Sequence, residues 1–125
     1  MSHGDFVAKA DAICTAYAKG TASITRPRTY AEIVAYVEKA LPLYQAALQR
    51  LDALEPPSAD EPAVRAWLAA DHRVAKAVRE LGLAARRHDF PGVTAAASRA
   101  QLEGSASRRA AAELGLHVCA RLSDR

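Results

Sequence analysis

The segment YAEIVAYVEKALPLYQAALQRL, Tyr30 to Leu51, carries the clearest structural signal in this chain of 125 residues. Its apolar residues recur at alternating intervals of three and four, which is the spacing of one face of an α-helix. Thr29 precedes the segment and Glu32 follows three residues later, a pair typical of a capping box at a helix start. Because the pattern continues in phase beyond Pro42, we expect one kinked helix rather than two helices.

Three further segments show helical spacing, separated by the loops TRPRT (25–29), EPPSADEP (55–62) and HDFPG (88–92). Four helices joined by short loops predict an all-α fold, an antiparallel up-down-up-down four-helix bundle that forms a single domain over residues 5–125. The positions that share one helical face are Phe6, Ala10, Ile13, Tyr17 and Ile24 in the first segment; Val64, Trp67, Asp71, Val74, Val78, Leu81 and Ala85 in the third; and Val93, Ala97, Ala100, Gly104, Ser107, Ala111 and Leu114 in the fourth.

The opening MSHG, residues 1–4, resembles the remnant of an expression tag and is expected to lie outside the bundle. A signal peptide that this remnant replaced would not be visible, so the start of the chain carries no information about the compartment. No run approaches the roughly 18 apolar residues that a membrane span needs, so we predict no transmembrane segment.

The formal net charge is +3, which makes the surface only mildly basic. The basic clusters are short: Arg86, Arg87 and His88 at one end of the predicted bundle, and Arg108 and Arg109 near the other. They form no continuous basic stripe and have no aromatic residues interleaved, so no nucleic-acid partner is predicted.

Cys14 and Cys119 lie near opposite ends of the chain but near the same end of the predicted bundle. A straight fourth helix would carry Cys119 past the level of Cys14, which lies about 14 Å into the first helix. A left-handed Gly115 that ends the fourth helix would let residues 116–119 return toward Cys14. We therefore expect a Cys14–Cys119 disulfide; the alternative is two buried free thiols in a cytosolic protein.

Three segments together resemble a group of largely uncharacterised actinobacterial secreted proteins and lipoproteins, whose helical domains carry one cysteine near each end. The segments are DFVAKADAICTAYA (5–18), YAEIVAYVEKALPLYQAALQRLDALEPPSAD (30–60) and LGLHVC (114–119). This resemblance implies an extracytoplasmic location, secreted or in the cell envelope, and no known chemistry. The pair Asp71 and His72 matches no motif of the group, so no functional residue is transferred from it.

Asp71 is a charged residue at the centre of an otherwise apolar helix face, and both ways of drawing that face direct its side chain into the core. Counting from the shared end of the bundle places Tyr17, Tyr44 and the turn from Gly104 to Arg108 at its level. A buried carboxylate must be protonated, hydrogen-bonded by tyrosine hydroxyls, or paired with a cation, for which Arg108 and Arg73 are the candidates.

The small residues of the fourth helix opposite large aromatic ones favour a cavity beside Asp71. Its predicted ligand-binding residues are Tyr17, Tyr44, Trp67, Gly104 and Arg108. Alternatively, alanine and glycine simply let the helices approach closely, Asp71 belongs to a structural network, and Trp67 is a plug in the core.

A catalytic role is a second hypothesis for the same region. An inward Asp71 could act as a general acid or base on a small apolar substrate, with His72 at the rim of the pocket. Otherwise His72 is a histidine that faces solvent.

Known catalytic and metal-binding motifs do not occur in the sequence. It has no glycine-rich phosphate loop, no Gly-x-Ser-x-Gly, no His-Glu-x-x-His, and no Glu-x-x-His pair of the kind that di-iron bundles use. The four histidines are scattered, so the sequence predicts no metal site and gives no argument for haem or another cofactor.

The sequence thus favours an extracytoplasmic binding module for a small apolar molecule or a protein partner, with the oligomeric state open. One alternative is a small cofactor-free enzyme that uses Asp71 in the core. A further alternative is a purely structural interaction domain, which would have no cavity and an exposed apolar patch instead.

Overall fold

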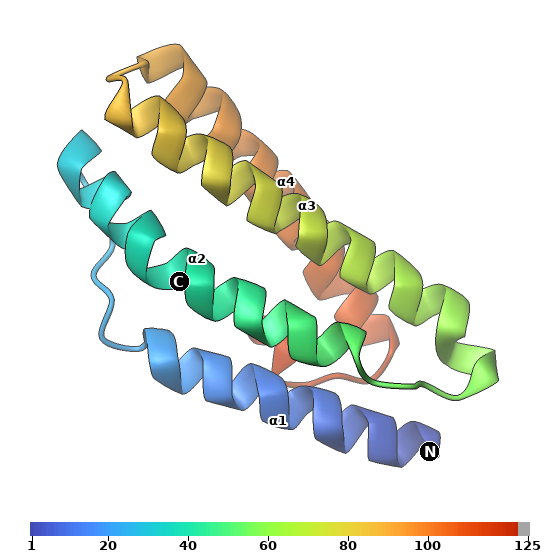
Figure 1. Cartoon of the computed structure of the whole chain (residues 1–125). Helices are drawn as coiled ribbons and strands as arrows, with labels where there is room; N and C mark the ends of the chain where they lie inside the picture. Colours follow the sequence, from blue (N-terminus) through green and yellow to red (C-terminus); the bar gives the residue numbers. More distant parts are fainter. Residues whose placement is uncertain (123–125) are drawn as a thin grey trace.

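Four long helices make up most of residues 1–122, the part of the chain that the computed structural model describes. They are α1 (His3–Thr21), α2 (Tyr30–Asp52), α3 (Glu61–Arg86) and α4 (Phe90–Glu113), with short 3-10 helices η1 (Ser58–Asp60) and η2 (Cys119–Arg121). Within this described part there is no strand, and no helix is long and apolar enough to cross a membrane. Successive helices run in opposite directions (Figure 1), so the predicted four-helix bundle is confirmed.

Side-chain caps define the starts of three helices. Ser2, Thr29 and Asp89 each accept a hydrogen bond from the backbone N–H three residues later, at 3.0–3.1 Å, which satisfies a donor that the helix itself leaves free. The cap at Ser2 places the start of α1 at His3, two residues before the position where the domain was expected to begin. His3 lies in α1 and its Nδ1 is 2.7 Å from a carboxylate oxygen of Asp60.

The end of α4 has the geometry that the sequence predicts. Gly115 adopts a left-handed φ of 84° directly after the helix. The N–H of Leu116 donates to the carbonyl of Ala111 at 2.9 Å, and the N–H of Gly115 donates to Ala112 at 3.0 Å. These two bonds form a Schellman motif, which stops the helix and turns the chain back toward α1.

One helix matches its predicted extent and another ends earlier than predicted. α2 runs through Pro42 as one helix, in agreement with its continuous apolar face. α1 ends at Thr21, so Ile24, which the helical spacing included, lies in the loop that leads to α2.

The main core lies at the end of the bundle where α1 and α3 begin and where α2 and α4 end. The C-terminal segment, residues 114–122, contributes to this core and connects α4 to α1, which also packs on α2 (Figure 1). The buried residues of this cluster are Phe6, Ala10, Ile13, Cys14, Leu51, Val64, Trp67, Leu68, Ala111, Leu114, Leu116 and Cys119. The candidate site is therefore built around the meeting point of four helices and the chain's return segment.

Candidate functional site

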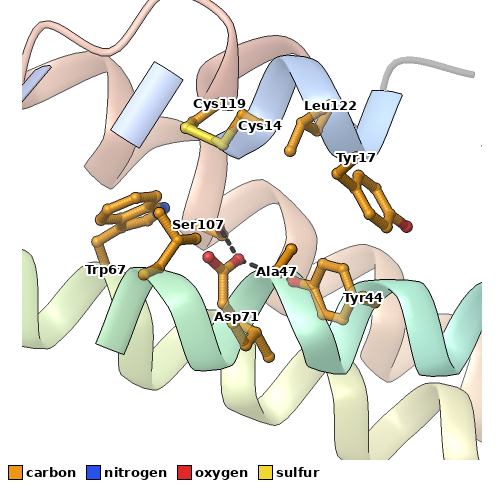
Figure 2. A pocket seen from close by; sticks show the side chains of 11 residues that line it. Cys14, Tyr17, Tyr44, Ala47, Trp67, Asp71, Ser107, Cys119 and Leu122 are labelled. Carbon is orange, nitrogen blue, oxygen red and sulfur yellow. Dashed lines mark hydrogen bonds between the residues drawn. A yellow bond between two sulfur atoms is a disulfide. The ribbon is translucent and has the colours of Figure 1, made fainter. Parts of the chain in front are cut away.

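A cavity of about 30 Å³ lies between the four helices and the C-terminal segment, beside the disulfide (Figure 2). Its polar or aromatic walls are Tyr17 from α1, Tyr44 from α2, Trp67 and Asp71 from α3, and Ser107 from α4. Cys119 and Leu122 line the side formed by the C-terminal segment. Since a water molecule needs roughly 10–15 Å³ of such space, the cavity is large enough to hold water.

Asp71 is buried at the edge of this cavity, with 8% of its surface exposed. Its Oδ1 accepts a 2.9 Å hydrogen bond from the Tyr44 hydroxyl and a second, short hydrogen bond from the Ser107 hydroxyl. The other carboxylate oxygen lies on the side of Trp67 and the disulfide (Figure 2). The prediction that Asp71 points into the core is therefore confirmed, and two neutral hydroxyl groups stabilise it there.

The environment shifts the pKa of both partners. Burial raises the pKa of Asp71 above its ordinary value and is the largest effect. The hydrogen bonds from Ser107 and Tyr44 and the nearby His72 lower this pKa, and the nearby Asp52 raises it slightly. Burial, followed by the closeness of the Asp71 carboxylate, raises the pKa of Tyr44. Tyr44 is thus a neutral donor at neutral pH, and Asp71 keeps its proton to a higher pH than an exposed aspartate does.

Tyr17 contacts the site through its ring rather than through a bond to the carboxylate. Its ring meets the Tyr44 ring edge-on, with centroids 5.5 Å apart and an interplanar angle of 63°. The Tyr17 hydroxyl is directed away from Asp71 in Figure 2. Of the two tyrosines expected at this level, Tyr44 is the one whose hydroxyl holds the carboxylate.

Two predicted members of the site do not line the cavity. Gly104 is buried in α4, but neither it nor Arg108 is among the residues that line the cavity. Arg108 donates a 3.1 Å hydrogen bond to the hydroxyl of Ser105, and Arg73 forms an exposed ion pair with Glu103. The hypothesis that Arg73 neutralises Asp71 is therefore wrong, because its side chain extends along the outer surface from α3 to α4.

His72 lies on the exposed face of α3, and it is not among the residues that line the cavity. Its Nε2 is 2.8 Å from a carboxylate oxygen of Asp52, and both side chains are well exposed. His72 therefore faces solvent, as the alternative interpretation expected, and Asp71 and His72 lie on different faces of α3.

The predicted disulfide is present: Cys14 and Cys119 are joined, with their Cα atoms 5.3 Å apart. The sequence reasoning missed the residue that supports it, Asp11. One carboxylate oxygen of Asp11 accepts the backbone N–H groups of Val118 and Cys119 at 3.0 and 3.2 Å, and the other accepts that of His117 at 3.1 Å. An acidic residue one helical turn before Cys14 was the signal that could have indicated this contact.

Ser107 is the second residue that was missed as a partner. Its position on the inner face of α4 was predicted, but its hydroxyl was not assigned to Asp71. Knowing that two helices face each other gives no exact relative height, and a hydroxyl reaches only a carboxylate at its own level.

Within residues 1–122, no three His, Cys, Asp or Glu side chains are grouped so that they could hold a metal ion.

No family model matches the chain, and neither the curated proteins nor the solved structures compared with it give a match.

Proposed function

We propose that the chain is an extracytoplasmic binding module that takes up a small, largely apolar molecule with one hydrogen-bonding group in the cavity at Asp71. The observation that carries this proposal is the buried Asp71 carboxylate, which is held on one oxygen by Tyr44 and Ser107 and borders a cavity with otherwise apolar and aromatic walls. Ligand pockets typically combine such walls with a few convergent polar groups.

The size of the cavity limits what can enter without a change in its walls. Pockets for drug-sized ligands measure roughly 300–1,000 Å³, whereas this cavity measures about 30 Å³. A ligand of more than a few atoms would therefore displace a wall. Leu122 belongs to the C-terminal segment and lines the cavity, so this segment is the wall that we expect to move.

Two observations support an extracytoplasmic location. Disulfides persist in oxidising compartments, and the Cys14–Cys119 bond closes nearly the whole chain. The segments around both cysteines also resemble those of actinobacterial secreted proteins and lipoproteins.

The binding proposal can be tested with p-cresol, which has an apolar ring and one hydroxyl group. Trp67 is the single tryptophan of the chain, so its indole N–H gives one assignable NMR resonance at the cavity wall. We expect a saturable shift of this resonance on titration with p-cresol. Ala47 lines the cavity and Ala46 is exposed on the same helix, so Ala47→Leu should abolish the shift and Ala46→Leu should preserve it. Equal responses of both variants would refute binding in the cavity.

Acid–base catalysis is the second candidate, and the raised pKa of Asp71 favours it. Asp71→Asn separates the two functions, because the amide keeps the size and one acceptor oxygen of the carboxylate but cannot exchange a proton. With the amide oxygen held by Tyr44 and Ser107, the amide nitrogen faces the cavity as a donor, so a binding module would still bind p-cresol, with lower affinity, whereas an enzyme would lose turnover.

A protein partner or a structural interaction role would use the outer surface instead. Phe90 and Leu102 keep 67% and 69% of their surface exposed, and Leu83 keeps 47%. Single exposed apolar residues are common on folded proteins, so they indicate a partner less specifically than the cavity indicates a ligand.

A further inference from the structure

The indole N–H of Trp67 is a buried donor that opens onto the cavity. Trp67 is 1% exposed, and none of the hydrogen bonds within residues 1–122 uses its N–H group. In this described part, no side-chain nitrogen or oxygen is sealed off without a partner, so the indole nitrogen must border open space. The space that Trp67 lines is the cavity, and Figure 2 shows the nitrogen on that side of the ring.

The second oxygen of Asp71 is the matching acceptor. Both hydrogen bonds to Asp71 end on Oδ1. Its other oxygen, Oδ2, accepts neither of them, and because no side-chain oxygen in residues 1–122 is sealed off without a partner, Oδ2 must also border open space. Trp67 and Asp71 are four residues apart on α3, so their side chains lie on one face of the helix. The cavity therefore presents one donor and one acceptor from neighbouring turns.

The chemistry of the indole N–H and the carboxylate oxygen determines which ligand fits. An ammonium ion cannot accept a hydrogen bond from the indole N–H, and the charged carboxylate repels an anion. A hydrocarbon would leave both groups without a hydrogen bond, at a cost of about 1–3 kcal/mol for each. A hydroxyl group accepts one hydrogen bond and donates another. With a volume of about 30 Å³, the cavity admits a water molecule or the smallest alcohols.

We infer that this cavity is a hydroxyl-binding site, in which a resident water molecule accepts a hydrogen bond from the indole N–H of Trp67 and donates one of its O–H groups to Asp71. A hydroxyl group of a ligand takes the place of this water. The inference of a resident water does not depend on the proposed function, whereas its replacement by the hydroxyl group of a larger ligand rests on that function.

The resident water is tested on the whole chain without added ligand, by oxygen-17 magnetic relaxation dispersion, which counts waters held for longer than the molecule takes to tumble. We expect the wild-type chain to hold at least one more such water than Ala47→Leu, in which the added side chain fills the cavity. Ala46→Leu, on the exposed side of α2, should retain the wild-type count. Equal counts in the wild type and folded Ala47→Leu would overturn the inference.

A second readout assigns the water to its partners. Trp67→Phe removes the donor and keeps an aromatic ring, so it should lower the count of long-lived waters by one while the circular dichroism spectrum stays helical. In the wild type, the indole proton should show a nuclear Overhauser effect to water with the sign of a long-lived contact. A folded Trp67→Phe variant with an unchanged count would show that the water does not bind Trp67.

Titration with methanol distinguishes the two sources of the hydroxyl. If methanol enters, the indole resonance shifts saturably and the long-lived water is lost, which supports replacement by a ligand hydroxyl. If methanol leaves the resonance unchanged while the water persists, replacement is overturned and the water site stands. Failure of p-cresol to bind with the water still present would count against the proposed function alone.

Discussion

The hydroxyl of Tyr44 donates a 2.9 Å hydrogen bond to Oδ1 of Asp71 and so ties the middle of α2 to the middle of α3. Ser107 donates to the same oxygen from α4, so one carboxylate connects three of the four helices. Such a buried network fixes the relative heights of the helices only when its members are satisfied. The protonation and partners of Asp71 should therefore affect both stability and the properties of the cavity.

The first prediction concerns pH. The folded-state pKa of Asp71 lies above its ordinary value of 3.8, so between these two values the folded chain binds more protons than the unfolded chain. The contribution of Asp71 to the free energy of unfolding is thus fully present below about pH 3.8 and is lost as the pH rises through the raised pKa. Asp71→Asn removes this titration and keeps an acceptor oxygen for Tyr44 and Ser107.

We therefore expect Asp71→Asn to gain stability relative to the wild type as the pH rises through that window, by about 1.4 kcal/mol for each unit of pKa shift. Urea unfolding followed by circular dichroism at a series of pH values measures this difference. A difference that stays constant with pH would show that the pKa of Asp71 is not raised by folding.

The second prediction concerns Tyr44→Phe. The hydrogen bond from Tyr44 lowers the pKa of Asp71, so its removal should raise that pKa further, which a carbon-13 NMR titration of the carboxyl group measures. Loss of a hydrogen bond to a charged group should also lower the free energy of unfolding by about 1.5–3 kcal/mol. Tyr36→Phe, on the same helix but away from the cavity walls, is the control and should leave both quantities unchanged.

The fold could be predicted from sequence because its signals are local. The spacing of apolar residues, the caps at Thr29 and Asp89, and the stop at Gly115 each depend on a few neighbouring residues, and the structure contains both caps and the stop. The inward direction of Asp71 follows from the same periodicity. The cysteine pairing required one more step, the return of the chain after Gly115.

The partners of Asp71 could not be derived in the same way, because they depend on distances across the bundle. Arg73 pairs with Glu103 rather than with Asp71. Ser107 donates to Asp71, but a count of residues along α4 cannot show whether Ser107 or its neighbour Arg108 lies at the level of the carboxylate. The size of the cavity depends on how closely several side chains pack, and a list of small residues does not determine it. Asp11 was missed because its three donors lie more than 100 residues away in the chain.

The third prediction concerns the disulfide. The bond closes a sequence separation of 105 residues, and in the chain-entropy model such a loop removes about 4–5 kcal/mol of denatured-state entropy. Cys14→Ala/Cys119→Ala should lower the free energy of unfolding by about 2–5 kcal/mol and steepen its dependence on urea, since the unfolded chain then exposes more surface. Unchanged midpoint and slope would mean that the bond does not restrict the unfolded chain.

The fourth prediction concerns the cap at Asp11. Asp11→Ala leaves the N–H groups of residues 117–119 without their acceptor, and we expect a loss of about 1–2 kcal/mol, as for other caps. Hydrogen exchange should accelerate about tenfold at those amides and much less in α2, because 1.4 kcal/mol corresponds to one factor of ten. Lys9→Ala, at an exposed position of α1, serves as the control. Uniform acceleration throughout the chain would indicate global destabilisation rather than release of the C-terminal segment.

The fifth prediction concerns the close approach of α2 and α3 at Gly82. A Cβ at this position would lie 2.9 Å from Cγ1 and 3.2 Å from Cβ of Val37, which is closer than van der Waals contact allows. Helix propensity alone would favour alanine over glycine by about 0.8–1.0 kcal/mol. Overpacking against a stiff β-branched side chain costs about 1–3 kcal/mol, so we expect a net loss of stability in Gly82→Ala.

Three further variants, Gly20→Ala, Val37→Ala and the double variant Gly82→Ala/Val37→Ala, separate packing from propensity in this test. At Gly20, also within a helix, an added Cβ would meet only Leu43 at 3.7 Å, an ordinary contact, so Gly20→Ala should stabilise the chain by about 0.5–1 kcal/mol. The double variant Gly82→Ala/Val37→Ala should be less destabilised than the sum of its two single variants, because each change relieves the strain or the gap that the other creates. Thermal or urea unfolding of the four variants gives this coupling, and strictly additive effects would mean that Val37 does not set the spacing between α2 and α3.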